Sequence, residues 1–240
     1  MKGCVFLRLF AGGLALMAAT QGSALTIPGN GGTGFGGPVG GGNLVLSDNG
    51  SNLTMTFNRG PANFQDNLVI YIDSVTGGPG STANFTDTAD GGRIAISGFN
   101  GTSRTLATFA PGFGVDYAIS IENGFAGLFS TTLNGSHIFQ NSVGIGLTGN
   151  NTAPSYTVQF PLINIGITPG ETFSLVGTLI SSSAFRSDET FVNPASLNAG
   201  FGGNVTWSNS ASYTVIPEPS IGLMMLSGFG FLAWFRKWRA

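Results

Sequence analysis

The chain has little of the material from which catalytic and metal sites are usually built. Its 240 residues include one cysteine, Cys4, and one histidine, His137. Cys4 lies ahead of an apolar run near the N-terminus and would leave with a signal peptide. The mature chain would then have no thiol, which excludes disulfides, thiolate catalysis and cysteine-based zinc sites. Because no Gly-x-Ser-x-Gly sequence accompanies it, His137 is expected to be a strand-edge or partly buried residue and not a general base.

Charge is also scarce. Charged residues make up 8% of the chain, and between Leu25 and Ile216 ten acidic residues stand against four arginines and no lysine. The central region therefore has a net charge of −6. A weakly acidic surface without lysine argues against nucleic acid as a partner. Glycine, serine, threonine and asparagine replace the missing charges, as is typical of a secreted β-protein with many turns.

The N-terminus has the layout of a signal peptide. Lys2 and Arg8 supply positive charge, Leu9–Ala19 is an apolar core, and Thr20–Ala24 is rich in small residues. This order predicts export, with cleavage after Ala24. The apolar core is too short to span a membrane stably.

The C-terminus has three parts in a fixed order. Pro217-Glu218-Pro219 is followed by the apolar run Ser220–Phe235, and a basic cluster follows that run: Arg236, Lys237 and Arg239. Both prolines fix φ and lack an N–H, so the tripeptide is expected to be extended and accessible. As a helix the run would span about 24 Å, against about 30 Å of hydrocarbon core. The basic cluster is expected to stay on the cytoplasmic side of a membrane, with the rest of the chain outside.

These three parts resemble a PEP-CTERM sorting signal, although the resemblance covers only residues 216–240. It implies that an exosortase-like membrane enzyme is a partner and that the C-terminal helix associates with the membrane before processing. It also implies delivery to the cell surface or extracellular matrix of a Gram-negative bacterium that makes exopolysaccharide. The alternative is an ordinary single-pass anchor.

The region between the two ends predicts an all-β fold. Residues 25–43 are expected to form a flexible glycine-rich leader, because nine of the fifteen residues of Gly29–Asn43 are glycine. Residues 44–215 are expected to form one antiparallel β-sandwich of jelly-roll type. The expected strands are separated by turn residues: Leu44–Leu46, Leu53–Phe57, Leu68–Ile72, Arg93–Ser97, Arg104–Phe109, Val115–Ile121, His137–Leu147, Ser155–Ile165, Thr172–Ser181 and Asn204–Val215.

Three local predictions add detail to this all-β fold. Asp48-Asn49-Gly50 is typical of a hairpin turn between the first two strands. The continuous apolar run Leu68–Ile72 predicts a central strand that is buried on both faces. Thr190–Leu197 fits a short helix or a loop, and the sequence does not choose between them.

One acidic turn is a candidate calcium site. Asp87 and Asp90 are three residues apart, next to Gly91-Gly92. Calcium takes six to eight oxygen ligands, which acidic glycine-rich loops can supply. The alternative is that Asp and Gly are present only as turn formers. No other cofactor is expected.

The aromatic residues leave two interpretations open. Five of them lie in expected strands and would either stack on sugar rings or fill the core: Tyr71, Tyr117, Tyr156, Trp207 and Tyr213. The sequence as a whole predicts an exported, non-enzymatic protein with a structural or adhesive role in exopolysaccharide or biofilm. The alternatives are a carbohydrate-binding module, with polysaccharide as its partner, and a secreted glycan-active enzyme.

Overall fold

A computed structural model describes residues 24–216 of the chain. Two predicted features lie outside this range. The first is the signal peptide up to residue 23, whose expected cleavage point, Ala24, opens the described part. The second is the sorting tail with its named residues: Pro217, Glu218, Pro219, Arg236, Lys237 and Arg239. Within residues 24–216, no helix is both long enough and apolar enough to cross a membrane.

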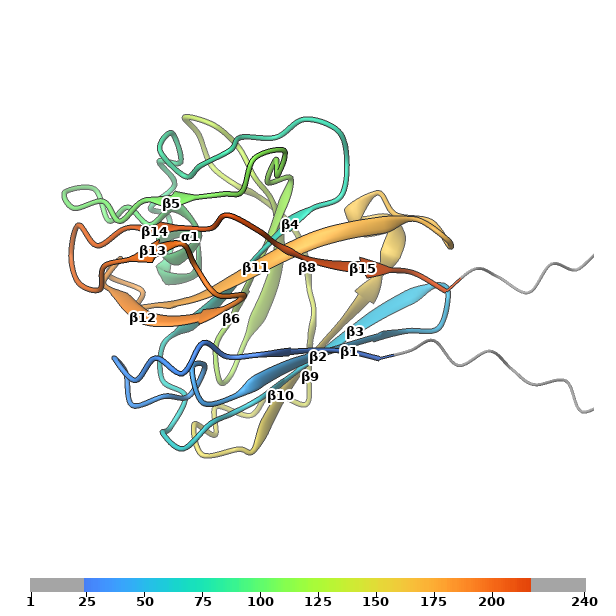
Figure 1. Ribbon diagram of the computed structural model, residues 1–240, viewed down its shortest axis with the longest axis horizontal. Helices are drawn as coiled ribbons and strands as arrows, with labels where there is room; N and C mark the ends of the chain where they lie inside the picture. Colours follow the sequence, from blue (N-terminus) through green and yellow to red (C-terminus); the bar gives the residue numbers. More distant parts are fainter. Residues whose placement is uncertain (1–23, 217–240) are drawn as a thin grey trace, which may run out of the picture.

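Two antiparallel sheets face each other (Figure 1). The five-stranded sheet has the order β1-β2-β3-β10-β9, with bounds Leu25–Pro28, Asn43–Asp48, Asn52–Asn58, Ser155–Pro161 and Gly144–Ile145. The seven-stranded sheet has the order β12-β11-β4-β6-β7-β8, with bounds Arg186–Phe191, Thr172–Ile180, Asn67–Asp73, Tyr117–Ile121, Ala126–Ser130 and Ile138–Ser142. Its seventh strand, β15 (Ala211–Thr214), pairs with β11 beside β12. The fold is therefore mostly β and antiparallel, as the sequence predicts.

The larger hydrophobic core fills the space between the two sheets. Alternate residues of β2 and β3 point into it, including Leu44, Met55 and Phe57. Ile70 and Ile119 meet them from the seven-stranded sheet. This alternation is the pattern expected of strands with one buried face. The hairpin predicted at Asp48-Asn49-Gly50 is confirmed by the pairing of β2 with β3.

A second core lies on the outer face of the seven-stranded sheet. Val69 and Tyr71 of β4 point into this second core, which also holds Phe109 and Trp207. It is covered by helix α1 (Gly91–Ser97) and by a small sheet of β13 (Ser196–Leu197), β14 (Val205–Thr206) and β5 (Ala107–Thr108). The prediction that Leu68–Ile72 is buried on both faces is confirmed, because these residues are fully buried.

Helix α1 corrects one prediction. Arg93–Ser97 was expected to be a strand, but it forms most of α1. Asp90 caps the helix by accepting a hydrogen bond from the N–H of Arg93, and Gly98 ends it in the left-handed conformation (φ 60°). These two capping residues favour the helix, because they satisfy backbone groups that would otherwise be unpaired.

The glycine-rich leader is the second correction. Residues 25–43 are not a free leader: Leu25–Pro28 form β1, and the following loop packs against β12. The reason is the fully buried carboxylate of Glu189. It accepts hydrogen bonds of 2.8–3.2 Å from four backbone N–H groups of this loop: Phe35, Gly37, Val39 and Gly40. Glycine lets the loop fold this tightly, since a Cβ at Gly40 would lie 2.0 Å from the carbonyl oxygen of Gly32.

Several strands are shorter than predicted. Arg104–Phe109 keeps only β5, and Asn204–Val215 is divided into β14 and β15. Ser155–Ile165 ends as a strand at Pro161 and continues as a 3-10 turn, Leu162–Ile165. Of the two forms considered for Thr190–Leu197, the loop is correct for residues 192–195, and the ends of the segment belong to β12 and β13.

Candidate functional site

A pocket of about 440 Å³ opens beside α1, on the outer face of β6 and β7 and next to β8. Its apolar wall consists of three phenylalanines, of which Phe129 is buried. Phe125 and Phe139 are 44% and 45% exposed and stack on each other with their ring centroids 6.5 Å apart. Phe139 also meets the ring of Phe129 edge-on. Exposed phenylalanines gathered at a pocket are unusual, because large apolar side chains are normally buried.

The opposite wall of the pocket is polar. It is lined by Asp90 and Arg93 from the start of α1, and by Ser120 and Glu122 from the end of β6. Asn67 holds the β6 pair in place by donating to Ser120 Oγ at 3.0 Å and to Glu122 Oε1 at 2.7 Å. The pocket therefore combines an aromatic surface with carboxylate and guanidinium groups.

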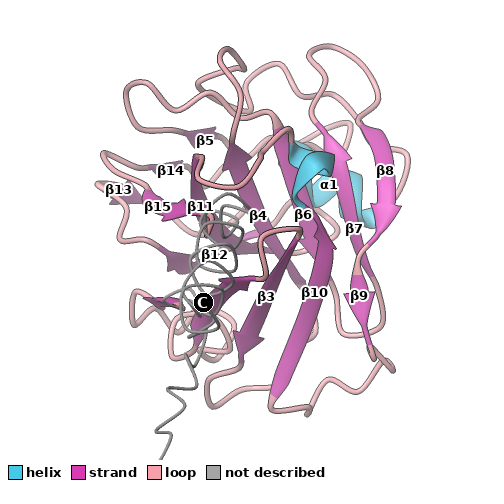
Figure 2. Ribbon diagram, turned by 90° about the vertical axis from the view of Figure 1, so that its right-hand side faces the viewer, coloured by secondary structure: helices cyan, strands magenta, loops and turns pink. Residues whose placement is uncertain are grey.

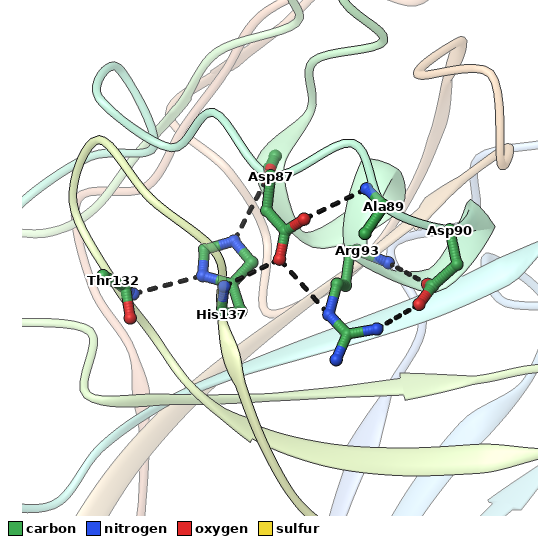
Figure 3. Close-up of polar contacts among 7 residues, drawn as sticks. Asp87, Ala89, Asp90, Arg93, Thr132 and His137 are labelled. Carbon is green, nitrogen blue, oxygen red and sulfur yellow. Dashed lines mark hydrogen bonds and ion pairs between the residues drawn. The ribbon is translucent and has the colours of Figure 1, made fainter.

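Arg93 is fixed by two carboxylates, which Figure 3 shows, and by the ring of Phe129. Its Nε lies 3.2 Å from Asp87 Oδ2, and its Nη1 pairs with Asp90. The guanidinium carbon lies 5.0 Å from the centre of the Phe129 ring, in a cation–π arrangement. Asp87 and Asp90 thus neutralise Arg93, and Glu122 leaves the pocket with a negative character.

Asp87 and Asp90 are the predicted calcium ligands, and the structure gives both of them protein partners. Asp87 is buried and accepts hydrogen bonds from the backbone N–H groups of Ala89 and His137, at 3.0 and 2.7 Å. Asp90 caps α1 and pairs with Arg93. Across residues 24–216, no three His, Cys, Asp or Glu side chains gather closely enough to hold a metal ion.

His137 lies in a buried trio that sequence reasoning missed, in which Asp87 and Ser97 are its neighbours. His137 Nδ1 accepts a hydrogen bond from the N–H of Thr132 at 3.1 Å, so in the neutral ring the proton belongs on Nε2. Nε2 then donates to Ser97 Oγ, 3.1 Å away. An activated serine needs the opposite arrangement, in which Nε2 accepts the hydroxyl proton and Nδ1–H donates to a carboxylate.

Burial sets the charge of His137. Desolvation lowers its pKa to about 4, although Asp87 acts in the opposite direction. The ring is therefore neutral at pH 7 and fixes the loop ahead of β8 by hydrogen bonds at both nitrogens. This trio holds Asp87 in place behind Arg93, and hence supports the polar wall of the pocket.

The aromatic residues singled out from the sequence are mostly core residues. Tyr71, Tyr156, Trp207 and Tyr213 are buried, and Tyr117 is half-buried. Burial raises the pKa of Tyr71 to about 12, and its hydroxyl donates to the carbonyl oxygen of Ile96 in α1. Of the two interpretations, the structure supports core packing for these four rings.

The pocket residues outside the Asp90-Gly91-Gly92 turn were not identified as site residues from the sequence. One local signal was present, because Asn123-Gly124 is a typical two-residue hairpin turn. Glu122 N–H donates to the carbonyl oxygen of Phe125 across this turn, and β6 pairs with β7 beyond it. A hairpin predicted at this turn would have included β7 and would have brought Glu122 and Phe125 next to each other.

The chain was compared with protein-family models, with curated proteins and with solved structures, and none of the three comparisons found a match.

Proposed function

We propose that this protein is exported, processed at its C-terminus by an exosortase-like membrane enzyme, and retained at the cell surface or in the extracellular matrix. The support for sorting comes from the sequence, in the order of Pro217-Glu218-Pro219, the apolar run and the basic cluster. In this proposal the described domain has a structural or adhesive role in exopolysaccharide or biofilm and is not an enzyme.

The jelly-roll assignment belongs to the same proposal. Successive strands β3 and β4 pair with β10 and β11 respectively, one pair in each sheet. Two strands that pass together from one sheet to the other in this way are typical of a rolled-up antiparallel ribbon. Lectin domains are among the proteins that have this architecture.

The adhesive activity that the geometry supports best is saccharide binding in the pocket beside α1. The observation that carries it is the exposed ring pair Phe125–Phe139 facing carboxylate and guanidinium groups. The C–H face of a sugar ring packs on an aromatic ring, and its hydroxyl groups donate to carboxylates such as Glu122. Because Arg93 is already neutralised, the pocket favours neutral sugars or amino sugars over uronic acids.

The direction in which the pocket faces agrees with this role. The described ends of the chain lie together: Leu25 pairs with Leu46, and the N–H of Ile216 contacts the Asp48 carboxylate. Figure 1 shows the ends of β1 and β15 at one side of the molecule and α1 toward the other. A chain attached through its C-terminus would therefore present the pocket away from the membrane.

Affinity electrophoresis through gels that contain a neutral glucan, an amino-sugar polymer or a polyuronate tests the saccharide proposal. We expect retention by one of the first two gels, and a roughly fivefold weaker affinity for Phe125→Ala, since one lost stacking contact is worth about 1 kcal/mol. Phe201→Ala is the matched control, because Phe201 is exposed but lies outside the pocket. Equal loss in both variants, or retention by the polyuronate alone, would contradict the proposal.

The carboxylates that line the pocket favour saccharide binding over glycan hydrolysis. Both oxygens of Asp90 are engaged by Arg93, one through its backbone N–H and the other through its guanidinium. Glu122 is the remaining carboxylate of the pocket lining. A glycosidase needs a second carboxylate that is free to act across the scissile bond. We therefore expect no release of reducing sugar from a glucan that the protein binds.

A further inference from the structure

The edge strands of both sheets lie along one flank of the molecule. β8 ends the seven-stranded sheet, and β9 ends the five-stranded sheet (Figure 2). Val143 connects them: its N–H donates to Ala126 of β7, and its carbonyl oxygen accepts from Gln159 of β10. The outer N–H and C=O groups of β8 pair with no other strand among residues 24–216.

This flank lacks the charges that usually protect an edge strand. All five residues of β8 are exposed, and its two large apolar side chains, Ile138 and Phe139, are 59% and 45% exposed. From Asn123 to Gly170 the chain contains no Asp, Glu, Lys or Arg. Lysine, inward-pointing charges and proline are the usual devices against edge-to-edge pairing. β8 has none of these three. It has a β-bulge opposite Leu128 and Phe129, which is another device of this kind.

The other edges of the two sheets are treated differently. β12 contains Asp188 and Glu189, and the loop of residues 29–40 covers its outer side by a bridge from Gly29 to Phe191. β1 is four residues long and ends at Pro28. The fold thus covers or shortens its edges on one side and leaves an exposed, uncharged edge on the other.

The charge distribution identifies what can dock on β8. The domain is acidic, with a net charge of −6 between Leu25 and Ile216, so two copies repel each other over most of their surface. The flank of β8 and β9 contributes nothing to this repulsion. A second copy of the chain also brings an edge with the same free backbone groups and the same apolar side chains.

We propose that two copies of this protein associate through β8, in antiparallel pairing about a two-fold axis that joins their seven-stranded sheets. Such an interface is isologous, so each copy offers the same strand and closes the edge of the other. Because each copy has its own C-terminal tail and pocket, the dimer is bivalent for both membrane and saccharide. Bivalence raises retention on a polymer without any new contact.

Cysteine cross-linking of the full chain tests this pairing. In a Cys4→Ser background, Ile138→Cys, Gln140→Cys and Ser142→Cys place one thiol at successive positions along β8. Antiparallel pairing about a two-fold axis brings one position closest to its own counterpart. We therefore expect one of the three variants to form a disulfide-linked dimer at least tenfold faster than Asn209→Cys, an exposed control away from β8.

A charge variant supplies the second arm of the test. Asn141→Lys adds one positive charge to β8 of each copy and is expected to abolish the cross-link of whichever cysteine variant forms it, whereas Asn209→Lys leaves it unchanged. Cross-linking no faster than the control, cross-links that persist with Asn141→Lys, or a product whose mass is not twice that of the chain would each overturn the proposal. Phe139 belongs both to the pocket and to β8, but cross-linking is measured without saccharide, so its outcome is distinguishable from that of the binding test.

Discussion

At the scale of single residues, several of the few ionisable side chains are buried and have hydrogen-bond or ion-pair partners within the protein. Arg93 is held between Asp87 and Asp90, and Glu189 is surrounded by backbone donors. Tyr213 donates to Asp48 Oδ2 at 2.6 Å, and both burial and this bond raise its pKa. With so little charge available, each pair is a local structural device, and each should be visible in the stability of the fold.

His137 makes stability depend on pH. Its folded pKa of about 4 lies below the ordinary value of about 6.5, so the unfolded chain binds a proton that the folded chain does not. This contribution is fully present above pH 6.5 and is lost as pH falls from 6.5 toward 4. We expect it to remove roughly 3 kcal/mol of unfolding free energy over that window. Urea unfolding at several pH values measures the slope.

A His137→Gln variant isolates this effect from the titration of the acidic residues. It should be less stable than the wild type at pH 7, because Thr132 and Ser97 lose well-placed partners. Its stability should nevertheless depend less on pH between 4 and 6.5. A variant with an unchanged slope over this window would show that His137 is not the group responsible.

At the scale of elements, capping and burial decide what periodicity cannot. The sequence predicts β2, β3, β4, β6, β10 and β11 because each is a run of apolar or alternating residues between turn signals. It fails at Arg93–Ser97, which was expected to be a strand and is a short helix capped by Asp90 and Gly98. It also fails at residues 29–43, because no local pattern reveals that a buried Glu189 more than 140 residues away binds this loop.

The candidate site was harder to predict than the fold for the same reason. Asp87 and Asp90 stand out in the sequence, but their partners come from distant segments: His137 from the loop before β8, and Phe129 from β7. The rings that attract notice in a sequence, Tyr71 and Trp207, are in the core. Which ring faces solvent depends on which sheet face is covered, and this is set by the packing of α1 and the small sheet.

The loop around Glu189 gives the element-scale prediction. In Glu189→Gln the side-chain amide would face backbone N–H groups, so at least one pair of donors would be left without an acceptor in a buried site. We expect a loss of about 3 kcal/mol in unfolding free energy. Limited proteolysis should then cut within residues 29–43, and denaturant unfolding should give the free energy.

Asp188→Asn is the matched control for this loop. Asp188 is the neighbouring acid of β12 and accepts one backbone hydrogen bond, from Gly34, in an exposed setting. We expect a loss of less than about 1 kcal/mol, since solvent can replace this bond. If both variants unfolded at the same denaturant concentration, the buried carboxylate would not be what orders the glycine-rich loop.

At the scale of the whole molecule, folding and sorting should be separable. β15 is tied to β11 and to Asp48, and the hydrogen bonds of the described domain reach Ile216. The PEP tripeptide begins at the next residue. A domain that completes its pairing before Pro217 is expected to fold without the tail.

Two tail variants test this separation. Glu218→Ala and deletion of residues 236–240 are each expected to shift the protein from the cell surface or medium to the membrane or periplasmic fraction. Their melting temperatures should stay within about 2 °C of the wild type, because a change of 1 kcal/mol shifts the melting temperature of a domain of this size by roughly 2–4 °C. Glu171→Ala removes an exposed acid inside the domain and should leave location unchanged. Normal surface delivery of both tail variants would contradict sorting by this signal. A fall in melting temperature that equals the effect of Glu189→Gln would instead make the tail part of the fold.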